Sequence, residues 1–426
     1  MRQARRATPR NGTSPGLMSN RIAALGLFAL LGASFGVSQF IRTAPAVLAP
    51  ELRRELGLAP ETLGLVFGLF FVAFTLVHLP VGALLDRYGP RRVMGAMLLL
   101  SAGGTFVFAS GEDAGMMIAG QVLSGLGSSV AFVGGLAVIA RRYPRERFGP
   151  MASWLTAIGG IGPILSGTPF AALVEAIGWR DAWRIGGAAL ALVALLILAL
   201  VRNAPPGHAD HARAPERLRD TLGGFGPILR TRQVWGIIAL AFAAFAVQIA
   251  VRGLWGGPYL ADIAGFGAIA RGNLLLTMSA AGTLGAIAFG WLEHRGVPRL
   301  ALILYGTLTV IGTYAFLAAL PSQGDTATAL LFAFVGFSGP YTILLLAHAR
   351  ALFPDHLTGR AITTVNVANF LGVSVMQIVP GWILGAFPAV DGHPPEIAYR
   401  TMFGVLAATL AVALLAFLRW GARGRR

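Results

Sequence analysis

Long apolar runs recur along the whole chain, separated by short polar or Arg-containing segments. Each run has about twenty residues, the length at which a helix rising 1.5 Å per residue crosses the roughly 30 Å hydrocarbon layer of a bilayer. The pattern predicts an all-α membrane protein with twelve transmembrane helices. The predicted spans are residues 20–48, 62–85, 93–110, 114–140, 150–177, 185–201, 234–260, 271–292, 298–320, 326–350, 359–387 and 400–419.

A polar segment containing Pro and Arg, residues 202–233, divides these spans into two groups of six. We therefore expect an N-terminal six-helix bundle over 20–201 and a C-terminal one over 234–419, joined by 202–233 as a connector. Residues 1–19 and 420–426 are predicted to be short tails.

The two predicted bundles carry similar residues at an offset of roughly 210 positions, as in transporters with repeated halves. Residues 143–149 match 353–359, both with an aromatic residue before Pro and a Gly five residues after that Pro, and residues 82–89 have a weaker counterpart at 290–296. The pair Gln39 and Arg42 matches the pair Gln248 and Arg252. These matches predict pseudo-symmetric halves.

Arginine is concentrated in alternate loops. The N-terminal tail, the loops near 86–92 and 141–147, the connector and the C-terminal tail hold most of it, which by the positive-inside bias predicts cytoplasmic termini. The net charge of +16 thus lies between the spans and does not indicate a nucleic-acid partner. All 34 basic residues are Arg, which suggests a GC-rich bacterial genome and a bacterial inner membrane.

Several enzyme classes lack their residues here. There is no Cys and no Lys, so thiolate metal sites, cysteine nucleophiles and Schiff-base lysines are excluded. Gly32–Gly36 fits the nucleophile-elbow spacing but lies inside an apolar helix, where that motif does not function. We expect no enzyme, no cofactor and no metal, since the connector histidines His208 and His211 are only a pair.

The loop after the second span reads Gly82-Ala-Leu-Leu-Asp86-Arg87-Tyr-Gly89-Pro-Arg91-Arg92. It resembles the signature loop of the major facilitator superfamily, and the Gly178–Arg184 stretch before the sixth span is similar to another element of that family. The resemblance implies that the loop is a conformational latch. Gly82 is expected to allow close helix approach, and Asp86 to pair with Arg87, Arg91 or Arg92.

The family resemblance implies two bundles around a central site, operating by alternating access, but fixes no substrate. The fifth span, Gly159–Gly167, is similar to an element of exporters and antiporters, with Ser166 where Gly is usual; a proline kink explains it equally well. Gln121 stands roughly where many proton-coupled members carry Arg. A proton-coupling carboxylate is also missing from the middle of every predicted span.

Arg42 and Arg252 are the candidate substrate-binding residues. Charged groups inside a bilayer cost about 2.5–3.5 kcal/mol each on insertion scales, so those that occur usually face a cavity. Helical spacing puts Gln39 beside Arg42 and Gln248 beside Arg252, and two guanidinium groups related by pseudo-symmetry suit a carboxylate or phosphate-like group. Alternatively, both Arg residues mark the outer water boundary.

Other polar residues within the spans are further candidates for the substrate site. They are Asn366, Asn369, Tyr341 and Trp255, each of which also fits a structural role as interhelical glue or interfacial aromatic. His78 is a candidate for proton coupling, and a hydrogen-bonded structural histidine is the alternative.

The sequence therefore predicts a lipid-embedded, monomeric secondary transporter of a small solute, with or without a coupled proton or ion. Its substrate is predicted to be an organic or inorganic anion. Two other functions fit the sequence: an exporter of neutral or amphipathic compounds, and a membrane sensor that does not transport.

Overall fold

The computed structural model describes residues 15–78, 80–201, 203, 226–320 and 324–422. Most of the connector and the ends of both predicted tails lie outside this range. Within it, twelve helices are long and apolar enough to cross a membrane, which confirms the predicted number of spans. The first helix begins at Pro15, so residues 15–19 are helical, and the part of it that is apolar enough to cross a membrane begins at Leu25.

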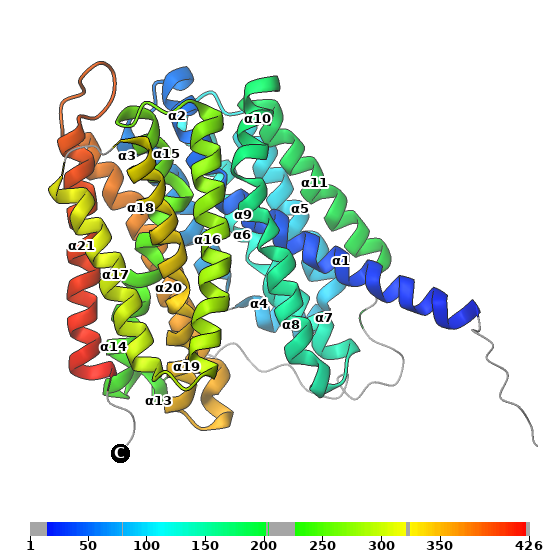
Figure 1. Ribbon diagram of the computed structural model, residues 1–426. Helices are drawn as coiled ribbons and strands as arrows, with labels where there is room; N and C mark the ends of the chain where they lie inside the picture. The colour runs from blue at the N-terminus through cyan, green and yellow to red at the C-terminus, as the bar shows by residue number, and fades with distance from the viewer. Residues whose placement is uncertain (1–14, 79, 202, 204–225, 321–323, 423–426) are drawn as a thin grey trace, which may run out of the picture.

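The described residues of the first half form eleven helical segments (Figure 1). They are α1 (Pro15–Thr43), α2 (Pro45–Leu56), α3 (Pro60–His78), α4 (Pro80–Tyr88), α5 (Pro90–Ala109), α6 (Ala114–Ser128), α7 (Val130–Arg142), α8 (Arg145–Gly159), α9 (Ile161–Leu165), α10 (Thr168–Ile177) and α11 (Trp179–Leu200). Several of these are pieces of one span, because Pro and Gly residues interrupt the helical hydrogen bonds there.

The second half forms an equivalent set. Its segments are α13 (Gly226–Leu229), α14 (Arg232–Ala250), the π-helix η2 (Val251–Trp255), α15 (Gly256–Asp262), α16 (Ala268–His294), α17 (Arg299–Ala319), α18 (Asp325–Ser338), the 3₁₀ turn η3 (Gly339–Tyr341), α19 (Thr342–Leu352), α20 (Asp355–Gly385), α21 (Glu396–Ala416) and the π-helix η4 (Phe417–Gly421).

Most predicted boundaries differ from the structure by a few residues, and the second and fifth spans end at His78 and Leu165, earlier than predicted; two further differences have a clear physical cause. The first span ends at Thr43, and α2 follows as a separate helix of twelve residues, because Pro45 has no N–H to continue α1. The sixth span starts at Trp179, six residues before its predicted start, because Gly178 with φ +80° ends α10 and allows α11 to begin at once.

The internal repeat appears in the backbone. Tyr143 and Phe353 each end a helix in the same extended conformation, with φ and ψ of −120° and 149° for Tyr143 and −119° and 149° for Phe353. Pro144 and Pro354 then precede the next helix in each half. The sequence match between residues 143–149 and 353–359 therefore reflects equivalent helix-to-helix turns.

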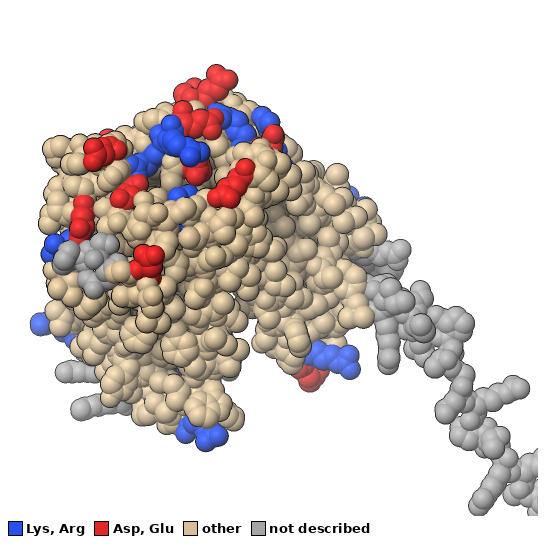
Figure 2. All heavy atoms as spheres, turned by 45° about the horizontal axis from the view of Figure 1, so that its top comes forward, with Lys and Arg blue, Asp and Glu red and all other residues tan. Residues whose placement is uncertain are grey.

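The two halves touch mainly at one end of the molecule, which we call the α2 end because α2 lies there (Figure 1). Helix α3 packs along α20, α2 packs on η2 and α15, and α9 and α10 pack on α16. The segments of the opposite end, including α4, α7, α8 and α19, pack mainly within their own half. The surface is indented between the halves on that side (Figure 2), so the two bundles are closed at the α2 end and parted at the other.

Candidate functional site

Arg42 lies between the two halves, in the last turn of α1. Its Nη2 donates a hydrogen bond to Ser38 Oγ at 3.1 Å. Its Cζ lies 4.3 Å from the ring centre of Phe74 and 5.7 Å from that of Phe370, on α3 and α20 respectively. The aromatic faces stabilise the cation, and α2 covers it from the α2 end. Arg42 thus sits at the interface of the halves.

Arg252 lies in the π-helix η2, at the position equivalent to Arg42. A π-helical turn accommodates an extra residue, which accounts for the four-residue spacing from Gln248 to Arg252 where Gln39 and Arg42 are three apart. A Cβ added to Gly253 would lie 3.3 Å from the carbonyl oxygen of Arg42, so the two Arg-bearing segments meet across the interface.

Neither arginine has an acidic partner in the part of the chain that the structure describes. The salt bridges found there involve other residues. The Nε atoms of both Arg42 and Arg252 are buried without a hydrogen-bond partner among the described residues. Two buried guanidinium Nε groups without acidic partners favour the binding of an anion, and of the two arginines Arg42 lines the cavity between the halves whereas Arg252 does not.

A small cavity adjoins Arg42. Two of its lining side chains are the amides of Gln121 and Gln377, one from each half and each only 1% exposed. The remaining lining residues are Ile41, Pro45, Phe67, Phe70, Phe71 and Gly253. In the sequence Gln121 stands out only with regard to proton coupling, and Gln377 does not stand out. A glutamine in mid-span is the sequence signal for both.

The predicted residues Gln248, Trp255 and Tyr341 make their contacts inside the second half. Gln248 Nε2 donates to the Gly339 carbonyl at 3.2 Å, and Trp255 Nε1 donates to the Gln377 carbonyl at 3.0 Å. Tyr341 is fully buried, with its ring against Gly306. The structure does not bring Trp255 or Tyr341 to the cavity, whereas Gln39 stays partly exposed beside Arg42.

His78 lies near Arg42 at the α3–α20 interface, and Asn366 and Asn369 lie on α20. The His78 ring is 5.3 Å from that of Phe74 and 5.8 Å from that of Phe370, so it shares both aromatic neighbours of Arg42. Asn366 and Asn369 precede Phe370 on α20, and no hydrogen bond within the described residues involves their side chains. They remain candidates for solute contact.

Ion pairs join the halves at the α2 end. Arg53 of α2 pairs with Asp262 at the end of α15, and Tyr399 of α21 donates a 2.6 Å hydrogen bond to the same carboxylate oxygen. Glu51 of α2 pairs with Arg271 of α16 at 3.3 Å. We call these five residues the gate cluster. Sequence reasoning missed it because its partners lie 209 and 220 positions apart.

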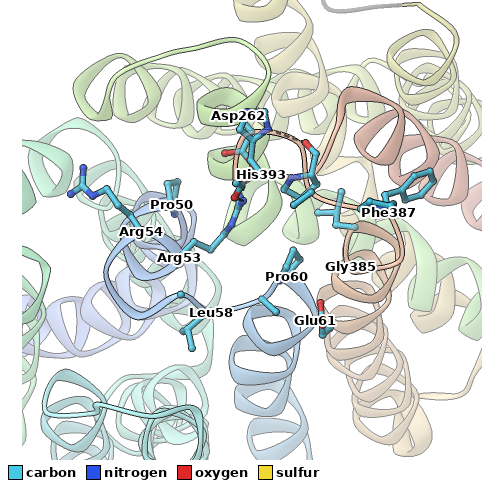
Figure 3. A pocket seen from close by; sticks show the side chains of 17 residues that line it. Pro50, Arg53, Arg54, Leu58, Pro60, Glu61, Asp262, Gly385, Phe387 and His393 are labelled. Atoms are coloured by element: carbon cyan, nitrogen blue, oxygen red, sulfur yellow. Dashed lines mark hydrogen bonds and ion pairs between the residues drawn. The ribbon is translucent and has the colours of Figure 1, made fainter.

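A pocket of about 670 Å³ opens beside the gate cluster at the surface of the α2 end (Figure 3). Arg53 and Asp262 approach each other at its edge, while Arg54 points away. Glu61, at the start of α3, contributes a carboxylate whose Oε2 is buried without a partner among the described residues. Acidic and basic side chains gather on this end of the molecule (Figure 2).

The predicted latch loop differs from expectation in two respects. Asp86 pairs with Arg141 of α7 at 3.2 Å, and Arg141 also donates to the Leu85 carbonyl at 3.2 Å. None of the three expected partners pairs with Asp86: Arg91 and Arg92 follow the turn at Gly89, and Arg87 lies over the ring of Tyr88. Gly82 has no atom within 4 Å of an added Cβ, so it makes no close helix contact.

The basic residues of the loop bind other groups. Arg87 lies over the ring of Tyr88 at 5.2 Å, and Arg91 donates from Nε to the Leu198 carbonyl at 2.5 Å. Asn203 accepts from the Arg91 backbone N–H at 3.0 Å and packs against Gly89, whose φ is +80°. Arg92 is exposed. The loop is thus tied to α11 as well as to α7.

Comparison with known proteins identifies relatives of the whole architecture. The sequence model described as Major Facilitator Superfamily matches residues 28–346. The uncharacterized transporter YgaY of Escherichia coli O157:H7 is 31% identical over 206 residues, 47% of this chain and 50% of that protein. The chain therefore spans about half the length of this relative.

Two other proteins match over nearly the full length. An MFS-type efflux pump of Mycolicibacterium smegmatis is 28% identical, with 95% of this chain and 93% of the pump aligned. The crystal structure of a bacterial homologue of the human lysosomal transporter Spinster, in an inward-facing and unoccupied conformation, superposes with a TM-score of 0.76. It is 16% identical and covers 96% of this chain and 98% of its own, which shows a shared fold.

Proposed function

Because the chain belongs to the major facilitator superfamily, we propose that this membrane transporter carries a small organic anion through a site between its two halves. Arg42 and Arg252 bind the anion, and the gate cluster closes the α2 end over it. Transport then alternates between a state parted at the α2 end and one parted at the opposite end.

The observation that supports an anion is the pair of guanidinium groups without acidic partners. A buried charge that lacks a counter-ion is strongly unfavourable, so the site is most stable when a mobile anion supplies the missing charge. Planar guanidinium groups bind carboxylates with two parallel hydrogen bonds, which favours a carboxylate over a spherical ion.

We further propose that the α2 end faces outward and that both termini are cytoplasmic. Arg87, Arg91, Arg92, Arg141 and Arg142 lie at the opposite end, as the positive-inside bias requires of a cytoplasmic face. In this orientation the described conformation is open toward the cytoplasm. In this state an imported anion is released into the cytoplasm, or an anion for export enters the site from the cytoplasm.

Export of amphipathic compounds is the second candidate function. The full-length match to an efflux pump favours it, as does an apolar groove of about 520 Å³ between α1, α9, α10 and α11. An exporter of neutral compounds has no need of paired arginines at its centre. Substituting Arg42 and Arg252 therefore distinguishes anion transport from the export of neutral compounds.

The test is ligand-dependent thermal stabilisation of the purified chain against small anions, small cations and amphipathic neutral compounds. We expect anions alone to raise the melting temperature, and Arg42→Gln and Arg252→Gln to abolish that effect. Arg232→Gln, at the exposed start of α14, is the matched control and should leave the effect intact. Stabilisation by amphipathic compounds that both variants retain would replace the anion proposal with the export function.

A further inference from the structure

We infer that the cavity beside Arg42 is a subsite for a hydroxyl group, so that the carried anion is a small hydroxy acid. This inference rests on the proposed function, since it adds a second recognition element to the same site. It concerns Gln121 and Gln377, the two buried amides that line this cavity.

The cavity is built from both halves. Gln121 comes from α6 and Gln377 from α20, and both side chains are 1% exposed. Gln121 Nε2 and Gln377 Oε1 are buried without a partner among the described residues, as is the Nε of Arg42. Three residues that line one cavity thus each carry an unpaired polar atom, and such atoms call for a ligand that forms hydrogen bonds with them.

The orientation of the Gln377 amide is fixed by its surroundings. Its Nε2 donates to the Ile249 carbonyl at 3.4 Å. Turning the amide over would place its oxygen against that carbonyl oxygen, which is repulsive, so Oε1 is held as the free atom. Gln377 therefore presents a hydrogen-bond acceptor.

Arg42 requires a ligand group that accepts a hydrogen bond, whereas Gln377 requires one that donates. A guanidinium Nε–H donates and never accepts, so the ligand group must accept a hydrogen bond from Arg42. Gln121 adapts to either role because its amide has no hydrogen bond among the described residues that fixes which way it turns. The occupant must therefore both donate to Gln377 and accept from Arg42.

Size and chemistry together select a hydroxyl group, that of the substrate or that of a water molecule which the substrate hydroxyl replaces. The cavity has a volume of about 10 Å³, which is room for one group the size of a water molecule. A halide or an ionised carboxylate oxygen accepts but cannot donate, and it would be repelled by Gln377 Oε1. A substrate hydroxyl satisfies both atoms, while the carboxylate of the same molecule meets the guanidinium groups of Arg42 and Arg252.

Three matched pairs of probes test this inference on the full chain: glycolate and acetate, lactate and propionate, malate and succinate. Within each pair only the hydroxyl differs. We expect at least one hydroxy acid to bind about tenfold more tightly than its partner in thermal titrations, since it satisfies a buried acceptor that its partner leaves unpaired. Gln377→Leu should reduce that ratio to about one.

Gln377→Met, unbranched and of similar volume, should behave as Gln377→Leu does if the latter fails to fold. Gln233→Leu, near the start of α14, is the control and should keep the tenfold preference. Suppose that the two acids of every pair bind with equal affinity and that Arg42→Gln abolishes their binding. The cavity then holds water in every state, and this result would overturn the hydroxyl subsite while the anion proposal stands. Failure of all six acids to bind would overturn both.

Discussion

The Arg53–Asp262 ion pair should control how often the α2 end opens. The two side chains come from different halves and are only 12% and 11% exposed, and Asp262 also accepts the hydrogen bond from Tyr399. Opening this end must separate Arg53 from Asp262 and return both charges to water. Replacing Asp262 with Asn removes the charge while the amide still accepts from Tyr399.

The expected magnitude follows from this burial. Breaking a fully buried ion pair by removing one partner costs about 3–5 kcal/mol, and hydrogen bonds to charged groups contribute about 1.5–3 kcal/mol. The pair borders a water-accessible pocket, so we take about 2 kcal/mol. With about 1.4 kcal/mol for each factor of ten, Asp262→Asn should raise the ratio of open to closed molecules about 30-fold.

Distance measurements between spin labels can follow this ratio. The chain has no cysteine, so labels at Glu112→Cys and Ala389→Cys, exposed positions of the two halves at the α2 end, report its opening without background. Arg53→Gln, Asp262→Asn and the double variant complete a double-mutant cycle in which the double variant should shift the ratio no more than either single one.

The Asp181–Arg184 pair provides the matched control. These residues lie three apart on α11, within one half, with side chains 59% and 45% exposed. Their removal should leave the open fraction unchanged, because the pair does not cross the interface. Additive effects of Arg53→Gln and Asp262→Asn, or an equal shift in the control, would refute the gating role of the gate cluster.

Two further predictions concern the same conformational change. Gly257→Leu should favour opening of the α2 end, because a Cβ added to Gly257 would lie 1.6 Å from the Ala46 carbonyl oxygen. Gly312→Leu is the control and should not favour opening, since a Cβ added to Gly312 has no atom within 4 Å. Spin-label distances measure the opening of both variants, and equal shifts would exclude a role for the α2–α15 contact. Arg141→Gln should change the transport rate by less than about fivefold without altering the half-saturating concentration, since the 74% exposure of Asp86 limits its ion pair to about 1 kcal/mol or less. Solute flux is measured for Arg141→Gln and for the control variant Arg142→Gln. A change in the half-saturating concentration of Arg141→Gln would contradict the latch role.

The membrane fold was predictable because its determinants are local. An apolar run of sufficient length must be helical in lipid, where each backbone polar group needs a partner within its own segment. The repeat then identified Arg42 and Arg252 as equivalent positions. The end of α1 at Thr43 was not predicted because the apolar run continues to Ala49, into the first half of α2, and Pro45 is the signal for a new helix there.

The partners of the charged and polar residues were not predictable in the same way. Asp86 pairs with Arg141, 55 positions away, although three arginines stand closer in sequence. Gln377 reaches the Arg42 cavity from the other half of the chain. Such contacts depend on how helices pack in three dimensions, and a single sequence carries hydropathy and spacing but not the register of one helix against another.

Counterflow in proteoliposomes tests the central claim that solute passes between the two halves. Vesicles loaded with an unlabelled acid that stabilises the purified chain should accumulate the radiolabelled acid transiently above its equilibrium level, with saturable kinetics. Arg42→Gln should abolish this accumulation, and Arg232→Gln should not. Binding of the acid without any counterflow by the native chain would contradict transport and identify a sensor.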